Sequence, residues 1–270
     1  MKKSLIALAV VVSAVSGVAH ADFRDVFSID GTITADTYES KWEWTIGKSL
    51  AFQNTTKDMT EDNKKLIITQ GSKALILAGH TKEAFSVAST GSGAVPVISF
   101  RDYKGDVVEL QNSAGQEGKG YFSLPMKDSA DSDLGSVKVN VSYAGVAVRS
   151  SSQYAEVFSV EAKDNSHIYY GGVANPALNR GSTASGVVSG FGGKPYTDLI
   201  AQVQKAKPGS SGQPQENWRG TFNMVSSDRV MASSYVLGID QGQTIEASFN
   251  SPVLKTTAWS APLSVLVTYN

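Results

Sequence analysis

The sequence contains no cysteine among its 270 residues and only three histidines. A chain without thiols forms no disulfide bond, no cysteine-ligated metal site and no thiolate nucleophile. Only His80 and His167 remain once the leader described below is removed, which is too few for a multi-histidine metal site. We therefore expect neither metal nor cofactor, and a fold stabilised by packing and backbone hydrogen bonds.

An excess of charge of either sign is also lacking, with 24 basic against 25 acidic residues. This balance does not favour nucleic acid as a partner. No nucleophile elbow or phosphate-binding loop is present, and the acidic group at Asp58, Glu61 and Asp62 lacks the spacing and the glycine of a calcium loop. We expect no catalytic residues, although a periplasmic carbohydrate-active enzyme with paired carboxylates remains an alternative, because their separation is a three-dimensional property.

Long apolar runs are scarce, and the clearest one lies at the N-terminus. Lys2 and Lys3 precede an apolar stretch over residues 5–15, and Ala19 and Ala21 supply the small residues that signal peptidase requires. We predict a signal peptide over residues 1–21 and a mature chain that begins at Asp22. No later run approaches the ~20 apolar residues of a membrane-spanning helix.

The remaining sequence is rich in alternating strand patterns. In residues 136–143, Val137, Val139, Val141 and Tyr143 share one face, and residues 42–46 and 244–249 repeat the pattern. Further strands are expected at residues 66–69, 74–77, 95–100, 107–110, 121–126 and 229–237. Short strands separated by Gly and Asp turns predict an all-β sandwich or barrel. An outer-membrane β-barrel is therefore a second alternative.

Residues 144–228 differ in composition from the rest, being rich in Gly and Ser and irregular in period. Thr197 or Asp198 could cap a helix that ends at Lys207-Pro208-Gly209, and a weaker helix is expected over residues 153–162. We interpret 144–228 as an inserted subdomain with one or two short helices. The sandwich would then comprise residues 35–143 and 229–270.

Both ends of the expected mature chain alternate. Phe23, Phe27, Ile29 and Ile33 share one parity near the start, and Leu263, Val265, Val267 and Tyr269 share one parity near the end. One hypothesis links them: residues 22–34 are donated as a strand to a neighbouring molecule, and the last strand borders the groove that receives such a strand. Alternation alone fits equally well an N-terminal segment that forms the first strand of its own domain.

The inserted segment also carries side chains suited to sugars. Sugar recognition uses flat aromatic faces together with planar polar groups. The candidates for glycan binding are Tyr169, Tyr170, Asn217, Trp218 and Arg219. The alternative for Trp218 is an anchoring role between insertion and sandwich, since aromatic side chains contribute strongly to cores.

Several segments, in the same order along most of the chain, resemble the subunits of the K88-type fimbriae of enterotoxigenic enterobacteria, both the major adhesin subunit and its minor paralogues. The matching segments are residues 33–36, 41–44 (Lys-Trp-Glu-Trp), 81–85, 135–146, 169–172 (Tyr-Tyr-Gly-Gly), 237–239, 242–247, 259–263 and 268–269. Between residues 147 and 228 the similarity weakens apart from 169–172, so no individual receptor-binding residue is carried over. Major adhesive and minor structural subunits both remain open.

The resemblance implies an immunoglobulin-like pilin sandwich that lacks its last strand. A periplasmic chaperone would complete it first, and the N-terminal extension of a neighbouring fimbrial subunit would replace the chaperone. Export through an outer-membrane usher to a cell-surface fimbrium is implied too. In this family the fibre-forming subunit can also bind host glycoproteins or glycolipids through its inserted subdomain.

Overall fold

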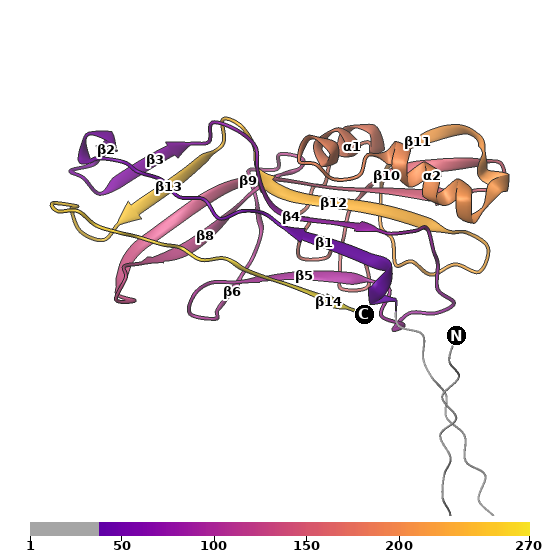
Figure 1. Ribbon diagram of the computed structural model, residues 1–270, viewed down its shortest axis with the longest axis horizontal. Helices are drawn as coiled ribbons and strands as arrows, with labels where there is room; N and C mark the ends of the chain where they lie inside the picture. Colours follow the sequence, from indigo (N-terminus) through magenta and orange to yellow (C-terminus); the bar gives the residue numbers. More distant parts are fainter. Residues whose placement is uncertain (1–37) are drawn as a thin grey trace, which may run out of the picture. The chain divides into compact units, whose positions relative to one another are not determined.

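The computed structural model describes residues 38–270 (Figure 1). The expected signal peptide and the candidate donor residues Phe23, Phe27, Ile29 and Ile33 lie outside this range. The described chain begins with a short 3-10 helix, η1 (Glu39–Lys41), and continues mostly as β strands in two sheets. Among the helices of residues 38–270, none combines the length and the apolar character needed to span a membrane.

The larger sheet has eleven strands. Its main order is β1 (Trp42–Ile46), β4 (Ala74–Thr81), β12 (Met231–Ile239), β9 (Asp133–Ser150), β13 (Thr244–Phe249), β3 (Lys65–Thr69) and β2 (Met59–Thr60). The remaining members are β7 (Gln111–Asn112), β8 (Lys119–Lys127), β10 (Tyr154–Val160) and β11 (Gly212–Gly220). The smaller sheet has the order β14 (Ser264–Tyr269), β5 (Pro96–Arg101) and β6 (Val107–Val108).

Strand β9 joins the two halves of the larger sheet. Its residues 135–139 pair with β13 and its residues 142–149 pair with β12, while β8 and then β10 occupy its other edge. Figure 1 shows it running between the region of β8 and β13 and the region of β10 and β12. The strand thus continues without interruption through residue 144, where the sequence changes in composition.

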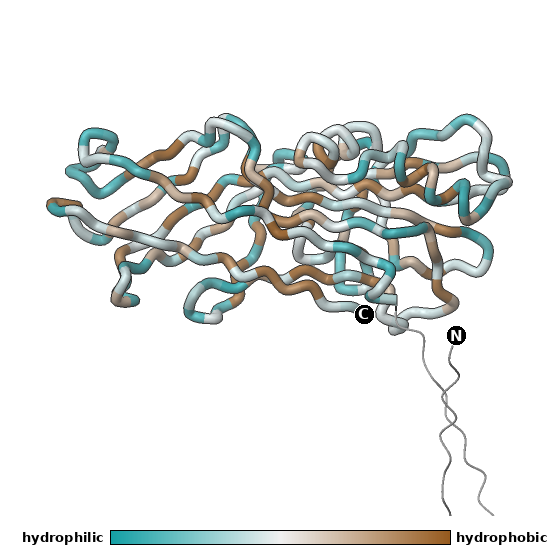
Figure 2. Tube along the Cα trace, viewed as in Figure 1, coloured by the Kyte–Doolittle hydropathy of each residue, from teal (hydrophilic) through white to brown (hydrophobic). Residues whose placement is uncertain are grey.

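Apolar side chains are buried on both faces of the larger sheet. Figure 2 shows hydrophobic residues, in brown, along the strands of the described chain. On one face, Phe100 from β5 and Phe122 from β8 meet between the sheets, with ring centroids 4.8 Å apart. On the other face, Val146 and Val236 pack against the helices. Every residue of β12 is buried, because this strand is covered on both sides. A strand covered on both faces loses the period-two signal that a half-exposed strand keeps.

Two α-helices cover one face of the larger sheet. They are α1 (Gly181–Gly190) and α2 (Tyr196–Ala206), which contact β9, β10 and β12. Helix α2 buries Leu199, Ile200 and Val203 and ends just before Lys207-Pro208, as the sequence predicts. The 3-10 turns η2 (Thr56–Asp58) and η3 (Pro208–Ser210) complete the described helical elements.

Two expectations within residues 144–228 are corrected. The weak helix expected over 153–162 is wrong, because this segment forms strand β10, paired with β9 and β11. A short apolar run does not distinguish strand from helix by period alone. Helix α1 was missed because its three glycines oppose helix formation. It forms where tertiary packing of Ala184 and Val188 outweighs that propensity.

The sequence-based fold class is confirmed: the described chain is an all-β sandwich with two short α-helices. Both sheets are open, and each has one edge strand that concerns the site. Strand β1 is an edge of the larger sheet, and β14 is an edge of the smaller one.

Candidate functional site: an open groove between two sheet edges

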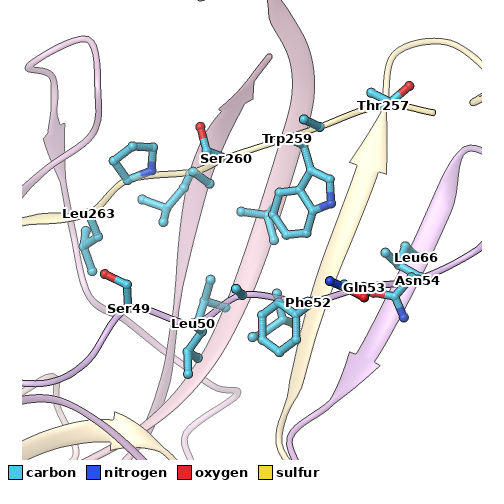
Figure 3. Close-up of a pocket in the computed structure, with 18 of the residues that line it drawn as sticks. Ser49, Leu50, Phe52, Gln53, Asn54, Leu66, Thr257, Trp259, Ser260 and Leu263 are labelled. Atoms are coloured by element: carbon cyan, nitrogen blue, oxygen red, sulfur yellow. The ribbon is translucent and has the colours of Figure 1, made fainter. Parts of the chain in front are cut away.

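A groove of about 1230 Å³ opens between the segment that follows β1 and the segment that precedes β14. Residues 46–56 line one side of it, and residues 253–263 together with Val265 line the other. Figure 3 shows Leu50 and Phe52 on one flank, with Leu263 and Trp259 opposite them. The two flanks run in opposite directions, because residues 50 to 52 face residues 263 to 259.

The flanks present backbone groups that lack partners in the sheets. Within the described part of the chain, residues 48–54 and 254–259 make no backbone-to-backbone hydrogen bond. The pairing of β1 with β4 ends at Ile46, followed by one bond from Gly47 N to the carbonyl of Ile76. On the other flank, Ser260 exchanges two hydrogen bonds with Lys127. Free main-chain donors and acceptors along two facing segments are what an added strand requires.

The floor of the groove is apolar and belongs to the core between the sheets. It is made by one side chain or more from each of five strands of the larger sheet. These are Leu66 (β3), Leu124 (β8), Val137 and Val139 (β9), Ile239 (β12), and Ile245 and Phe249 (β13). This floor carries no charged side chain, and the two lysines of the groove, Lys48 and Lys255, lie on its flanks.

One end of the groove is closed. The indole Nε1 of Trp44 on β1 donates a hydrogen bond to Tyr269 Oη on β14, with 2.8 Å between the two atoms. Of the residues predicted for the acceptor strand, Leu263 and Val265 line the groove. Val267 and Tyr269 are half-buried on the same face of β14, at the closed end. Burial raises the pKa of the Tyr269 phenol, against the lowering effect of the Trp44 hydrogen bond.

The sequence pattern does not predict the flank at residues 46–56. This segment has no clean alternation, since Lys48, Ser49, Leu50, Ala51 and Phe52 mix small, charged and apolar side chains. The only signal was indirect: a strand pattern at residues 42–46 is followed by about ten residues before the next turn or strand. The floor residues were recognised individually as strand residues, but their convergence is a result of sheet packing.

The five glycan candidates are not equivalent. Tyr169 is fully buried, with a positive φ of 66°, and its hydroxyl lies 2.9 Å from Ser233 Oγ in the core. Its ring therefore has no face open to a ligand in this structure. Tyr170 is 40% exposed beside β5, where its carbonyl accepts a hydrogen bond from Ile98 N.

Asn217, Trp218 and Arg219 lie on β11, away from the pairing of Tyr170 with β5. Trp218 is 60% exposed, and the guanidinium of Arg180 lies 5.0 Å from the centre of its ring. Arg219 forms an ion pair with Glu117 at 2.5 Å, and the Asn217 side-chain nitrogen is buried without a hydrogen-bond partner among residues 38–270. Trp218 is thus the exposed aromatic residue of this group.

Chemistry other than recognition has little support in the described residues. No group of three or more His, Cys, Asp or Glu side chains within them is arranged to hold a metal ion. The groove lining from Ile46 to Val265 includes no aspartate, glutamate or histidine in that part of the chain. Nδ1 of the partly buried His167 lies 3.3 Å from Oδ1 of Asp164, and Nε2 of His80 lies 3.5 Å from Oε2 of Glu43.

The comparisons with known proteins show the family of the chain. A family described as "Fimbrial, major and minor subunit" matches residues 1–270. The chain belongs to the K88 fimbrial subunit family. It is 44% identical to the K88 fimbrial protein AD of Escherichia coli and 43% identical to the K88 fimbrial protein AB, over the full length of each pair. It is 29% identical to the F41 fimbrial protein of Escherichia coli, again over the whole of both chains.

Membership of the K88 fimbrial subunit family has direct consequences. The chain is a fimbrial structural subunit, a class that is not typically enzymatic. Subunits of this family polymerise with other fimbrial subunits and form fimbriae at the cell surface.

Proposed function

We propose that this fimbrial subunit is assembled by donor-strand exchange, with residues 22–34 of one copy filling the groove of another. The observation that carries the proposal is the groove itself: two facing segments without backbone partners stand over an apolar floor. A strand added there pairs with both flanks and places every second side chain into the floor.

Lengths and patterns support residues 22–34 as the occupant. The flank at residues 46–56 has eleven residues, which as an extended chain span about 36 Å. Residues 22–34 form a thirteen-residue segment, long enough to follow this flank. Phe23, Phe27, Ile29 and Ile33 share one parity, so all four side chains point toward the floor when the segment is extended.

The same groove explains a need for a periplasmic chaperone and an outer-membrane usher. A subunit exported through the periplasm with an open apolar groove has an unprotected sheet edge, which invites aggregation. A chaperone strand placed in the groove would prevent this until a sibling subunit replaces it at the usher. Of the four predicted chaperone-contact residues, Leu263 and Val265 would face such a strand, whereas Val267 and Tyr269 lie at the closed end of the groove.

The test uses the mature chain and a synthetic peptide with the sequence of residues 22–34. The control peptide carries Asp in place of Phe23, Phe27, Ile29 and Ile33. At a peptide concentration 100 times Kd, binding stabilises the fold by about 2.7 kcal/mol. For a chain of this size that raises Tm by about 5–10 °C. A melting temperature unchanged by the native-sequence peptide would overturn the proposal.

A second function, binding of host glycoproteins or glycolipids, is supported by Trp218. A large aromatic ring that is 60% exposed, with a guanidinium held against it, offers a stacking surface and hydrogen-bond donors for a sugar. Glycan-array binding of the donor-complemented subunit, compared between the wild type, Trp218→Ala and Tyr170→Ala, tests this role. Retained binding in Trp218→Ala would exclude Trp218 from the site.

A further inference from the structure

The closed end of the groove is formed by a side-chain hydrogen bond between strands of different sheets. Strands β1 and β14 belong to different sheets, and no strand of the described chain lies between them. Yet Trp44 and Tyr269 bridge the gap directly through their 2.8 Å hydrogen bond. The groove lining ends with Ile46 on β1 and Val265 on β14, and Val267 lies between Val265 and Tyr269 on the same face of β14.

Trp44 is held firmly in this position. In the register of β1 with β4 it lies opposite Gly79, and a Cβ atom at residue 79 would be only 2.3 Å from the indole ring. The rings of Tyr169 and Tyr235 pack around the same indole, with centroids 6.2 and 6.4 Å away. The indole is therefore tightly packed, and moving it would break its contacts with Gly79 and with both tyrosine rings.

Tyr269 is anchored from the other side. It pairs with Pro96 in the register of β14 with β5, and the next residue, Asn270, exchanges two backbone hydrogen bonds with Val95. The side-chain amide of Asn270 also donates to the carbonyl of Asn165. Both halves of the bridge are thus fixed to their own sheets, and the bridge joins the two.

We propose that Trp44 and Tyr269 form an end stop that limits how far an incoming strand extends along the groove and so selects its register. The inference rests on the proposed donor-strand function and adds a determinant to it. A strand that follows the flanks meets the indole and the phenol beyond Ile46 and Val265. To pass further, it must break the Trp44–Tyr269 hydrogen bond and displace an aromatic ring from the core.

A register determinant is needed because the donor pattern repeats every two residues. A one-residue slip turns the apolar side chains away from the floor, but a two-residue slip keeps them facing it. Phe23, Phe27, Ile29 and Ile33 would therefore suit several registers. With eleven residues of flank for a thirteen-residue segment, the stop leaves the residues at one end of the segment outside the groove.

The experiment uses the full mature chain and a nested set of fluorescent peptides from residues 22–34, shortened by two residues at a time from either end. In the wild type, the first shortening at the end that meets the stop changes Kd by less than about twofold. In Tyr269→Ala the same two residues gain a place in the groove. Burying one more apolar side chain there makes the full-length peptide bind about tenfold more tightly than the shortened one.

Two further variants make the outcome decisive. Thr268→Ala alters an exposed neighbour on the opposite face of β14 and should keep the wild-type dependence of Kd on peptide length, which we call the profile. Trp44→Phe retains an aromatic ring but loses the indole N–H, so its profile moves toward that of Tyr269→Ala. If peptides bind but every variant shows the wild-type profile, the end stop is refuted and donor-strand binding stands. If no peptide binds to any variant, the donor-strand proposal itself fails.

Discussion

Gly79 and Trp44 are matched across strands β4 and β1: the indole ring lies where a side chain at residue 79 would be. A Cβ atom built on Gly79 would be 2.3 Å from Cζ3 of Trp44, well inside van der Waals contact. The absence of a side chain on β4 thus allows the ring on β1 to lie against the sheet and reach Tyr269. Gly79 on β4 thus leaves the space that Trp44 on the edge strand β1 needs to contact the other sheet.

We expect Gly79→Ala to destabilise the fold by about 1–3 kcal/mol, the cost typical of overpacking a well-packed core. The matched control is Gly186→Ala, an exposed position in the middle of α1 where an added Cβ meets nothing within 4 Å. That change should stabilise by about 0.5–1 kcal/mol through helix propensity. Urea unfolding monitored by tryptophan fluorescence measures both. Equal stability of Gly79→Ala and the wild type would contradict the packing described for Trp44.

Adjacent side chains on β14 point in opposite directions, one into the groove and the next to the outer surface. Val265 lines the groove, whereas Leu266 faces outward and is 53% exposed. Val265→Asp would place an unpaired carboxylate under the incoming strand, and we expect it to weaken binding of the 22–34 peptide by at least about 100-fold. Leu266→Asp should leave Kd within about twofold. Titration by fluorescence anisotropy gives both constants, and similar losses in the two variants would argue against a strand bound in the groove.

His80 makes the stability of the subunit sensitive to acid. Burial on β4 and, to a lesser degree, the positive charges of Lys194 and Lys82 lower the pKa of its imidazole from 6.5, against the opposing effect of Glu43. As the pH falls below about 6.5, the unfolded chain binds a proton that the folded chain resists, so the free energy of unfolding decreases. The loss is complete only below the lowered folded-state pKa.

Urea unfolding at pH 7.5 and pH 5.5 measures this loss. His80→Gln should show a smaller decrease than the wild type, because the group that titrates is gone. Glu43→Gln should show a larger decrease, because it removes the carboxylate that favours the charged imidazole. The same decrease in all three proteins would show that His80 does not contribute to the acid sensitivity.

Tyr169 and Trp218 should behave in opposite ways when changed. Tyr169→Phe removes a buried hydrogen bond to Ser233 and should cost about 1–3 kcal/mol of stability, without a direct effect on any ligand at the surface. Trp218→Ala alters a largely exposed side chain and should change stability by less than about 1 kcal/mol. Thermal unfolding checks both values. A large stability loss in Trp218→Ala would instead assign that residue an anchoring role.

Much of the strand content was predictable from local pattern. Residues 42–46 and 244–249 form β1 and β13 with the predicted bounds, because each of these strands has one core-facing and one outer face. Prediction was weaker where a strand is buried on both faces, and where the residues of a helix have low helix propensity. Strand β9 extends to Ser150, beyond the predicted end at residue 143, because residues 141–148 are buried on both faces. Strand β10 was missed because a run this short does not distinguish strand from helix by period alone, and α1 was missed because of its glycines.

The sequence by itself determined the chemical class of the protein: no thiols, too few histidines for a metal centre, and alternating patterns that require a sheet-based core. It also identified the last strand as one whose alternate residues face inward. Only the tertiary structure decided which of those residues border an open groove and which lie beyond its end. The reason is that the groove and its closure depend on contacts between distant parts of the chain, such as Trp44 with Tyr269, 225 positions apart. Local pattern specifies which face of a strand is apolar, but the neighbour that covers that face, or leaves it open, is chosen when the sheets pack.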